Sequence, residues 1–190
     1  AAMGVLLWYR APNKFMNAFG VVFVAVSIFA FMPQSWHERM GTIKTYQEDT
    51  SAMGRINAWE TAINIANDRP FGAGFEMYSQ TVFLIYAPNP VEQRVVDPRI
   101  ARAAHSIYFQ VLGEHGWIGL ALFLMLWLAT WRLAARVRRK ARRGGEEEWV
   151  FHFASMAQVS MVGFAVGGAF LSLAYFDLPY NVLAAVVVTA

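Results

Sequence analysis

The apolar residues of this chain gather in long runs, separated by one long polar stretch. Complete runs cover residues 15–32, 117–135 and 150–176, and a further run begins at residue 182. A helix needs about 20 mostly apolar residues to cross the hydrocarbon core of a bilayer. The pattern therefore predicts an all-α integral membrane protein, a multi-pass helical bundle with a large polar loop. The apolar runs at both ends are shorter than a span, so we expect a fragment of a larger protein.

The pattern divides the chain into six segments. We expect residues 1–32 to contain the end of one span, a short cytoplasmic turn and one transmembrane helix, and residues 33–116 to form a partly helical periplasmic loop. A transmembrane helix is expected in 117–135, a basic cytoplasmic loop in 136–149 and another transmembrane helix in 150–176. Residues 177–190 should form a periplasmic turn and the start of a truncated transmembrane helix.

Composition supports a lipid environment. The chain is 57% hydrophobic and 15% charged, whereas soluble domains are about 45–50% apolar and about 25% charged. A net charge of +3 is too small to indicate a nucleic-acid partner, and the absence of cysteine excludes disulfides and thiolate metal sites.

Arginine placement predicts the orientation. The stretch RLAARVRRKARRGGEEE, residues 132–148, follows an apolar run, and Arg10 and Lys14 precede another. Short loops rich in lysine and arginine stay in the cytoplasm, which puts residues 33–116 on the outer side. The arginine run could instead bind lipid headgroups or nucleic acid, but a topology determinant explains it without any further partner.

The outer loop carries helical patterns. Residues 52–67, 75–86 and 100–115 have helix spacing, with a Pro-Gly break between the first two and three prolines before the third. On the third predicted helix, His105 lies about one turn before Phe109 on the same face. Arginine contacts phosphate in a bidentate fashion and stays charged, and histidine accepts a proton near neutral pH. These residues favour glycan transfer from a lipid diphosphate to a hydroxyl group.

Two motifs in the loop resemble the O-antigen ligase and polymerase superfamily of bacterial envelope enzymes. The first is RINAWETAINIANDRPFGAGFEMY, residues 55–78, an arginine-led helix followed by a Pro-x-Gly-x-Gly turn. The second is AHSIYFQVLGEHGWIGL, residues 104–120, in which His105 and Ser106 precede a Gly-x-x-Gly pattern. The motif glycines are Gly72, Gly74, Gly116 and Gly119. The loop is also similar to O-glycosylation ligases associated with the exosortase A system.

The resemblance implies a glycosyltransferase of the bacterial inner membrane that uses an undecaprenyl-diphosphate-linked glycan. It implies a bundle of roughly ten to twelve membrane helices, metal-independent catalysis and no cofactor. The family arginine maps to Arg55 and the family histidine to His105. Ligases also use an arginine from an earlier periplasmic loop, so we expect only part of a site here. The acceptor could be a glycan, a lipid or a protein.

Other polar residues remain open between two interpretations. Arg94, Arg99 and Arg102 could bind the anionic substrate, although exposed arginines are usually only solvated. Glu114 could pair with a cation of the site or sit at the membrane rim, and Tyr180 could line the cavity. His105 and Arg55 could, without the motifs, be an interfacial anchor and a surface charge.

Two rival functions remain. A polymerase of the same superfamily would use another lipid-linked repeat unit as the acceptor. A non-catalytic transport or assembly subunit is the second rival, but transporters place charged residues at the midplane of their spans. The complete apolar runs here contain no acidic residue.

Overall fold

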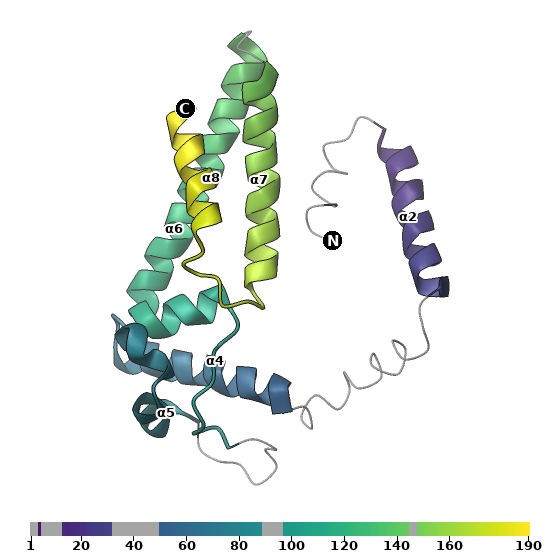
Figure 1. Ribbon diagram of the computed structural model, residues 1–190. Helices are drawn as coiled ribbons and strands as arrows, with labels where there is room; N and C mark the ends of the chain where they lie inside the picture. The colour runs from purple at the N-terminus through teal and green to yellow at the C-terminus, as the bar shows by residue number, and fades with distance from the viewer. Residues whose placement is uncertain (1–3, 5–12, 32–49, 89–96, 145–147) are drawn as a thin grey trace.

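The protein is built from helices, as its computed structural model shows (Figure 1). The structure describes residue 4 and residues 13–31, 50–88, 97–144 and 148–190. Within these ranges every regular element is a helix: α2 (Lys14–Phe31), α4 (Thr50–Asp68), η2 (Gly74–Tyr78), α5 (Gln80–Tyr86), α6 (Ile107–Gly144), α7 (Glu148–Gly168) and α8 (Asp177–Val188). The all-α prediction is confirmed for the described residues.

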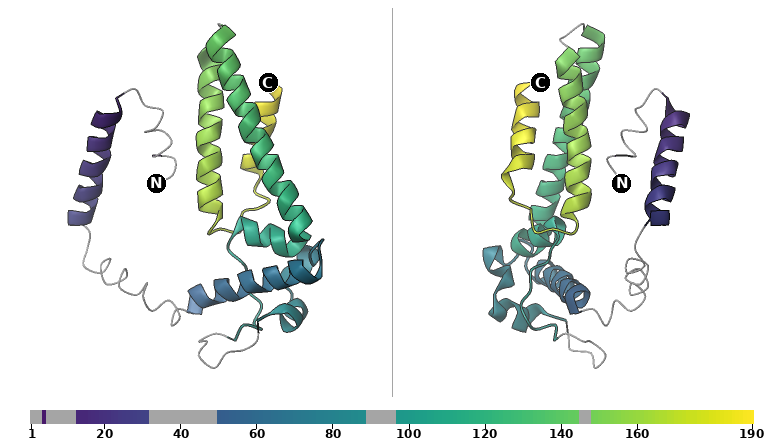
Figure 2. Two further views of the ribbon diagram at one scale, coloured as in Figure 1. Left: turned by 180° about the vertical axis from the view of Figure 1, so that it is seen from behind. Right: turned by 45° about the vertical axis from the view of Figure 1, so that its right-hand side comes forward.

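Helices α6, α7 and α8 lie side by side, and α4 crosses beneath one end of them (Figures 1 and 2). Two helices, α6 and α7, are long and apolar enough to cross a membrane. Much of the apolar surface of α6 is uncovered, with Leu122 59% and Met125 55% exposed. Such exposure is costly in water but normal against lipid. The number of spans and the outward placement of the loop remain predictions.

A single glycine divides α6 into two parts. Gly116 has φ 66° and ψ −167°, which is not helical, so a short helix of residues 107–115 precedes a long helix of residues 117–144. The spanning part therefore begins at Trp117. The long part continues to Gly144, so residues 136–144 of the predicted basic loop are helical. Its arginines, lysine and alanines are strong helix formers, which explains the difference.

Three predicted helix boundaries were wrong. The third loop helix begins at Ile107 rather than at residue 100. The loop helix predicted at 75–86 is two helices, η2 and α5, because the side chain of Ser79 accepts a hydrogen bond from the amide of Val82 and starts α5 there. The last complete apolar run does not form one helix to residue 176, because α7 ends at Gly168.

Helix α7 ends at a pair of glycines. The carbonyls of Gly167 and Gly168 accept hydrogen bonds from Phe170 and Leu171, at 3.1 and 3.3 Å, and form a turn there. The chain then re-enters a helix at Asp177, whose carboxylate suits the positive end of a helix dipole. The turn between α7 and α8 therefore covers residues 169–176, eight residues earlier than predicted.

Candidate functional site

Helix α4 and the short helix of α6 lie against each other and run in the same direction (Figure 1). Trp59 of α4 donates from Nε1 to the carbonyl of Ala104 at 2.6 Å and stacks on Phe109 at 4.9 Å between centroids. Further along, Trp117 Nε1 donates to Oδ1 of Asn67 at 3.0 Å. These contacts join the two sequence motifs along their length.

The glycines of the two motifs fit directly against one another. Gly72 and Gly116 both have positive φ, 75° and 66°, and the amide of Gly72 lies 2.7 Å from where a Cβ of Gly116 would stand. The same Cβ would overlap the carbonyl of Pro70. The amide of Ala73 donates to the carbonyl of Gly113 at 2.9 Å. Only glycine permits this approach, so the turn docks onto the kink of α6.

The far end of this interface holds a small pocket. It has a volume of about 170 Å³ and brings together residues from α4 and from the segment just before α6: Ser51, Gly54, Arg55, Arg102, Ala103 and His105. Both residues that the resemblance marks as catalytic, Arg55 and His105, line it, and so does Arg102 from the predicted substrate-binding set. The two guanidinium groups can bind an anion. The imidazole can accept a proton.

The two arginines enter this pocket differently. Arg55 is half-buried, and its Nε is buried with no hydrogen-bond partner among the described residues. A buried donor left without a partner costs about 1–3 kcal/mol, so the position favours an anionic ligand. Arg102 is exposed and passes over Gly54, where a Cβ would stand 2.6 Å from the Arg102 Cδ.

His105 lies outside the helix on which we expected it. Its backbone φ is 46°, and the helix starts two residues later at Ile107. The neighbouring Ala104 carbonyl is held by Trp59, and Ile107 packs against Gly168 of α7. A residue other than glycine whose backbone adopts the left-handed conformation stores about 1–3 kcal/mol of strain. Such residues cluster at functional sites. The His105 side chain is exposed, as a residue that reacts with a substrate must be.

A second polar cluster lies at the other end of the short helix. The Tyr175 hydroxyl donates to the carboxylate of Glu114 and lies 2.9 Å from His115 Nε2, with the ring of Phe75 edge-on to both aromatic rings. Glu114 is only 3% exposed. Burial raises the pKa of its carboxyl, and hydrogen bonds from Tyr175 and Gln110 oppose that shift. Glu114 thus binds the α7–α8 turn, and it forms no ion pair with a described cation.

The remaining predicted residues lie elsewhere. The Arg99 guanidinium donates from Nε to Oδ1 of Asp97 at 3.0 Å and from Nη2 to Oδ2 at 2.9 Å. These hydrogen bonds from Arg99 hold the pKa of the Asp97 carboxyl below its ordinary value. The Tyr180 hydroxyl donates to the Ala174 carbonyl at 2.6 Å, within the turn before α8. Arg94 lies outside the described residues.

The other two motif glycines have smaller roles. Gly74 has φ 70° and no neighbour within 4 Å of a built Cβ, and a Cβ at Gly119 would meet the side chain of His115. Across the described ranges, no group of three or more His, Cys, Asp or Glu side chains is placed to hold a metal.

Sequence reasoning missed three residues of this arrangement. Gly54 directly precedes the first motif and Trp59 lies within it, so their closeness to Arg55 in the sequence was the available signal. Tyr175 falls inside the predicted span of residues 150–176, and no local pattern links it to Glu114, which is 61 positions away.

Fold and site together define a helical membrane protein with a cation-lined pocket at one end of its helix bundle. The O-antigen ligase family model matches residues 1–124, a stretch that contains the pocket and both motifs. The chain belongs to the O-antigen ligase family. Searches of curated proteins and of solved structures found no match.

Membership in this family indicates the location and the general activity of the protein. Members of this family are integral inner-membrane proteins with glycosyltransferase-like ligase or polymerase activity. They act on a lipid-linked glycan donor and a polysaccharide acceptor in the membrane.

Proposed function

We propose that this protein transfers a glycan from undecaprenyl diphosphate to an acceptor hydroxyl on the outer face of the bacterial inner membrane. The observation that supports this most directly is the shared pocket of Arg55, Arg102 and His105. Residues that are far apart in the sequence meet there, and each brings a group that this reaction needs.

In this proposal the arginines hold the diphosphate of the donor. Arg55 contributes its buried, unpartnered Nε, and Arg102 approaches from above Gly54. Bidentate contacts to phosphate oxygens are charge-assisted, and they stabilise the negative charge that grows on the leaving group. At about 170 Å³ the pocket is smaller than the roughly 300–1,000 Å³ of complete ligand sites. It therefore matches the diphosphate, and the sugars extend beyond it.

His105 acts as the general base. The acceptor oxygen attacks the anomeric carbon, the bond from that carbon to the phosphate oxygen breaks, and undecaprenyl diphosphate leaves with the electron pair. The acceptor proton passes to the imidazole of His105. No step requires a metal or a cofactor.

The test uses the full-length protein in a strain that lacks its own copy, with transferred glycan measured against protein level. His105→Ala should lower transfer about 10²–10⁴-fold, the usual contribution of a general base. Arg55→Lys keeps the charge and loses the fork, and we expect about a tenfold loss.

Two controls separate chemistry from folding. His105→Gly removes the imidazole and accepts a φ of 46° without strain, so it should fold well and remain inactive. His152→Ala removes an exposed histidine at the start of α7 and should leave transfer unchanged. Full transfer by His105→Ala at normal protein levels would rule out the base assignment.

The same strain separates ligase from polymerase. If lipid-linked repeat units alone yield longer lipid-linked chains, the protein is a polymerase. If glycan appears only on a distinct acceptor, it is a ligase, which the His105 motif favours. The proposed subgroup of exosortase-associated ligases predicts exosortase genes next to the gene for this protein.

A further inference from the structure

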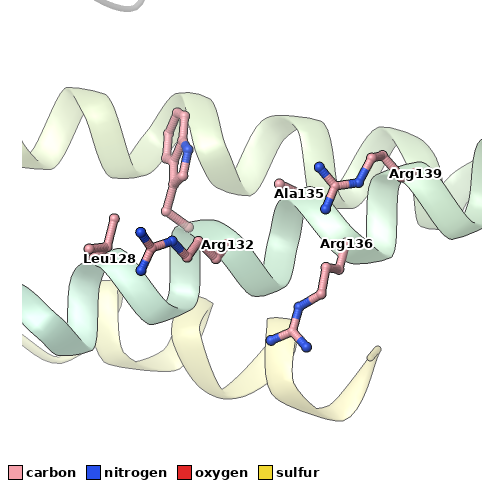
Figure 3. A pocket seen from close by; sticks show the side chains of 6 residues that line it. Leu128, Arg132, Ala135, Arg136 and Arg139 are labelled. Atoms are coloured by element: carbon pink, nitrogen blue, oxygen red, sulfur yellow. The ribbon is translucent and has the colours of Figure 1, made fainter.

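The opposite end of α6 carries a cationic groove that the transfer reaction does not use. It has a volume of about 610 Å³ and is lined by Leu128, Trp131, Arg132, Ala135, Arg136 and Arg139. A second hollow of about 410 Å³ continues it and is lined by Arg136, Arg139, Lys140, Arg143 and Gly144. Arg136 and Arg139 belong to both. Figure 3 shows Arg132, Arg136 and Arg139 as sticks on successive turns of α6.

The groove follows one face of the helix. Positions 132, 136, 139 and 143 are spaced by four, three and four residues, which places them in one stripe. All four arginines are exposed, whereas Ala134, Val137 and Ala141, on the opposite face, are buried, the last two against α7. The stripe therefore faces away from the helix packing.

With Trp117 taken as the start of the hydrocarbon core, the stripe crosses the boundary between hydrocarbon and headgroups. With a rise of about 1.5 Å per residue, Arg132 lies roughly 23 Å from Trp117 along α6, and Arg143 lies roughly 39 Å from it. The hydrocarbon core is about 30 Å thick. The wall of the groove is apolar at Leu128 and Trp131 and carries arginines from Arg132 onward, which is the polarity of a phospholipid from acyl chain to phosphate.

The three arginines that line the first hollow have no acidic partner among the described residues. Arg132, Arg136 and Arg139 form no ion pair with any carboxylate in the described ranges. An arginine at the edge of the hydrocarbon region is stable when its guanidinium meets a phosphate. Basic grooves beside spanning helices on the cytoplasmic side bind anionic lipid headgroups.

We propose that this groove is a binding site for an anionic phospholipid, with Arg136 and Arg139 as its central phosphate ligands. The positive-inside rule explains how many basic residues stand at this end. It does not require that they share one helical face, continue an apolar groove or lie exposed at headgroup depth. The site is independent of the transfer reaction at the other end of α6.

The test compares two double variants of the full-length protein that each remove two charges from the same segment. Arg136→Gln with Arg139→Gln alters the groove. Arg138→Gln with Arg142→Gln alters arginines that do not line it. Binding of phosphatidylglycerol is titrated in phosphatidylcholine nanodiscs, and retained lipid is counted by native mass spectrometry. Labelling of one introduced cysteine, Gly145→Cys, in a background without other cysteines checks that both variants keep the same topology.

We expect the groove variant to bind phosphatidylglycerol about 30-fold more weakly and the matched variant to change less than about threefold. An equal loss in both would show diffuse charge attraction and overturn the site, and so would unchanged binding in the groove variant. Competition by inorganic phosphate as strong as that by phosphatidylglycerol would show a free-anion site and also overturn the proposal.

Discussion

The two ends of α6 both present cations, but they are assembled in different ways. At the start of the helix, Arg55 comes from α4, while Arg102 and His105 come from the segment before α6. At the far end, Arg132, Arg136, Arg139 and Arg143 all belong to one continuous helix. The first group depends on tertiary contacts, and the second only on helical periodicity.

This difference matches the role that we propose for each end. Proton and glycosyl transfer need groups held in a fixed geometry, and the start of α6 supplies interlocked glycines, a tryptophan clamp and a strained histidine backbone. Attraction of a lipid headgroup needs charge at the correct depth and tolerates mobile side chains. Variants that disturb tertiary contacts should therefore damage the first end far more than the second.

The largest effect should come from Gly116→Ala, which breaks the first end. A Cβ there would overlap the Pro70 carbonyl, and φ 66° with ψ −167° is a glycine conformation. We expect a loss of about 3 kcal/mol or more in stability, seen as a marked fall in folded protein in the membrane. Gly144→Ala on the same helix has open space around it and should fold normally. Normal levels and activity of Gly116→Ala would mean that the docked turn is dispensable.

Gly54→Ala should disturb the pocket without weakening the fold. The new methyl group displaces Arg102, while alanine improves helix α4 by roughly 0.5–1 kcal/mol. We expect about a tenfold loss of transfer with equal or higher thermal stability. In an Arg102→Ala background the same change should cost nothing further, because the two positions act through one contact. Additive losses would show that Gly54 acts by another route.

Substitutions of Arg99 and Arg102 should have clearly different effects on transfer, although the two residues are only three positions apart. Arg102 lines the pocket, whereas Arg99 is held by Asp97. We expect Arg102→Gln to lower transfer at least about tenfold and Arg99→Gln to stay within about twofold of the original protein. Initial rates with a labelled donor measure both. If Arg99→Gln lowered transfer more than Arg102→Gln, the substrate would have to bind closer to Arg99.

The smallest effect concerns pH and Glu114. Because burial raises the pKa of this carboxyl above its ordinary 4.5, the folded state holds the proton more tightly than the unfolded state. Its contribution to stability is complete below pH 4.5 and declines as the pH rises through the folded-state value. Glu114→Gln stays neutral, so its melting temperature should fall less over that interval. Identical pH profiles for both proteins would show that Glu114 titrates normally.

Much of the helical architecture follows from local pattern. The helix at residues 50–68 and the apolar helices α2, α6 and α7 were all expected near their observed positions. The predictions failed where tertiary contacts decide the boundary. Helix α6 starts at Ile107 because Trp59 holds the Ala104 carbonyl and His105 adopts a positive φ. The Tyr175–Glu114 contact could not be predicted, because hydroxyl and carboxyl come from segments without a shared period.

The sequence by itself determined that the protein is helical, rich in apolar runs and basic in one segment between two of them, because hydrophobic periodicity and charge are local properties. It also marked Arg55 and His105 as candidates through their motifs. Only the tertiary structure decided that these two residues share a pocket with Arg102, that Arg99 does not, and that the motif glycines dock against each other. Those outcomes depend on close packing between segments, which no single stretch of sequence specifies.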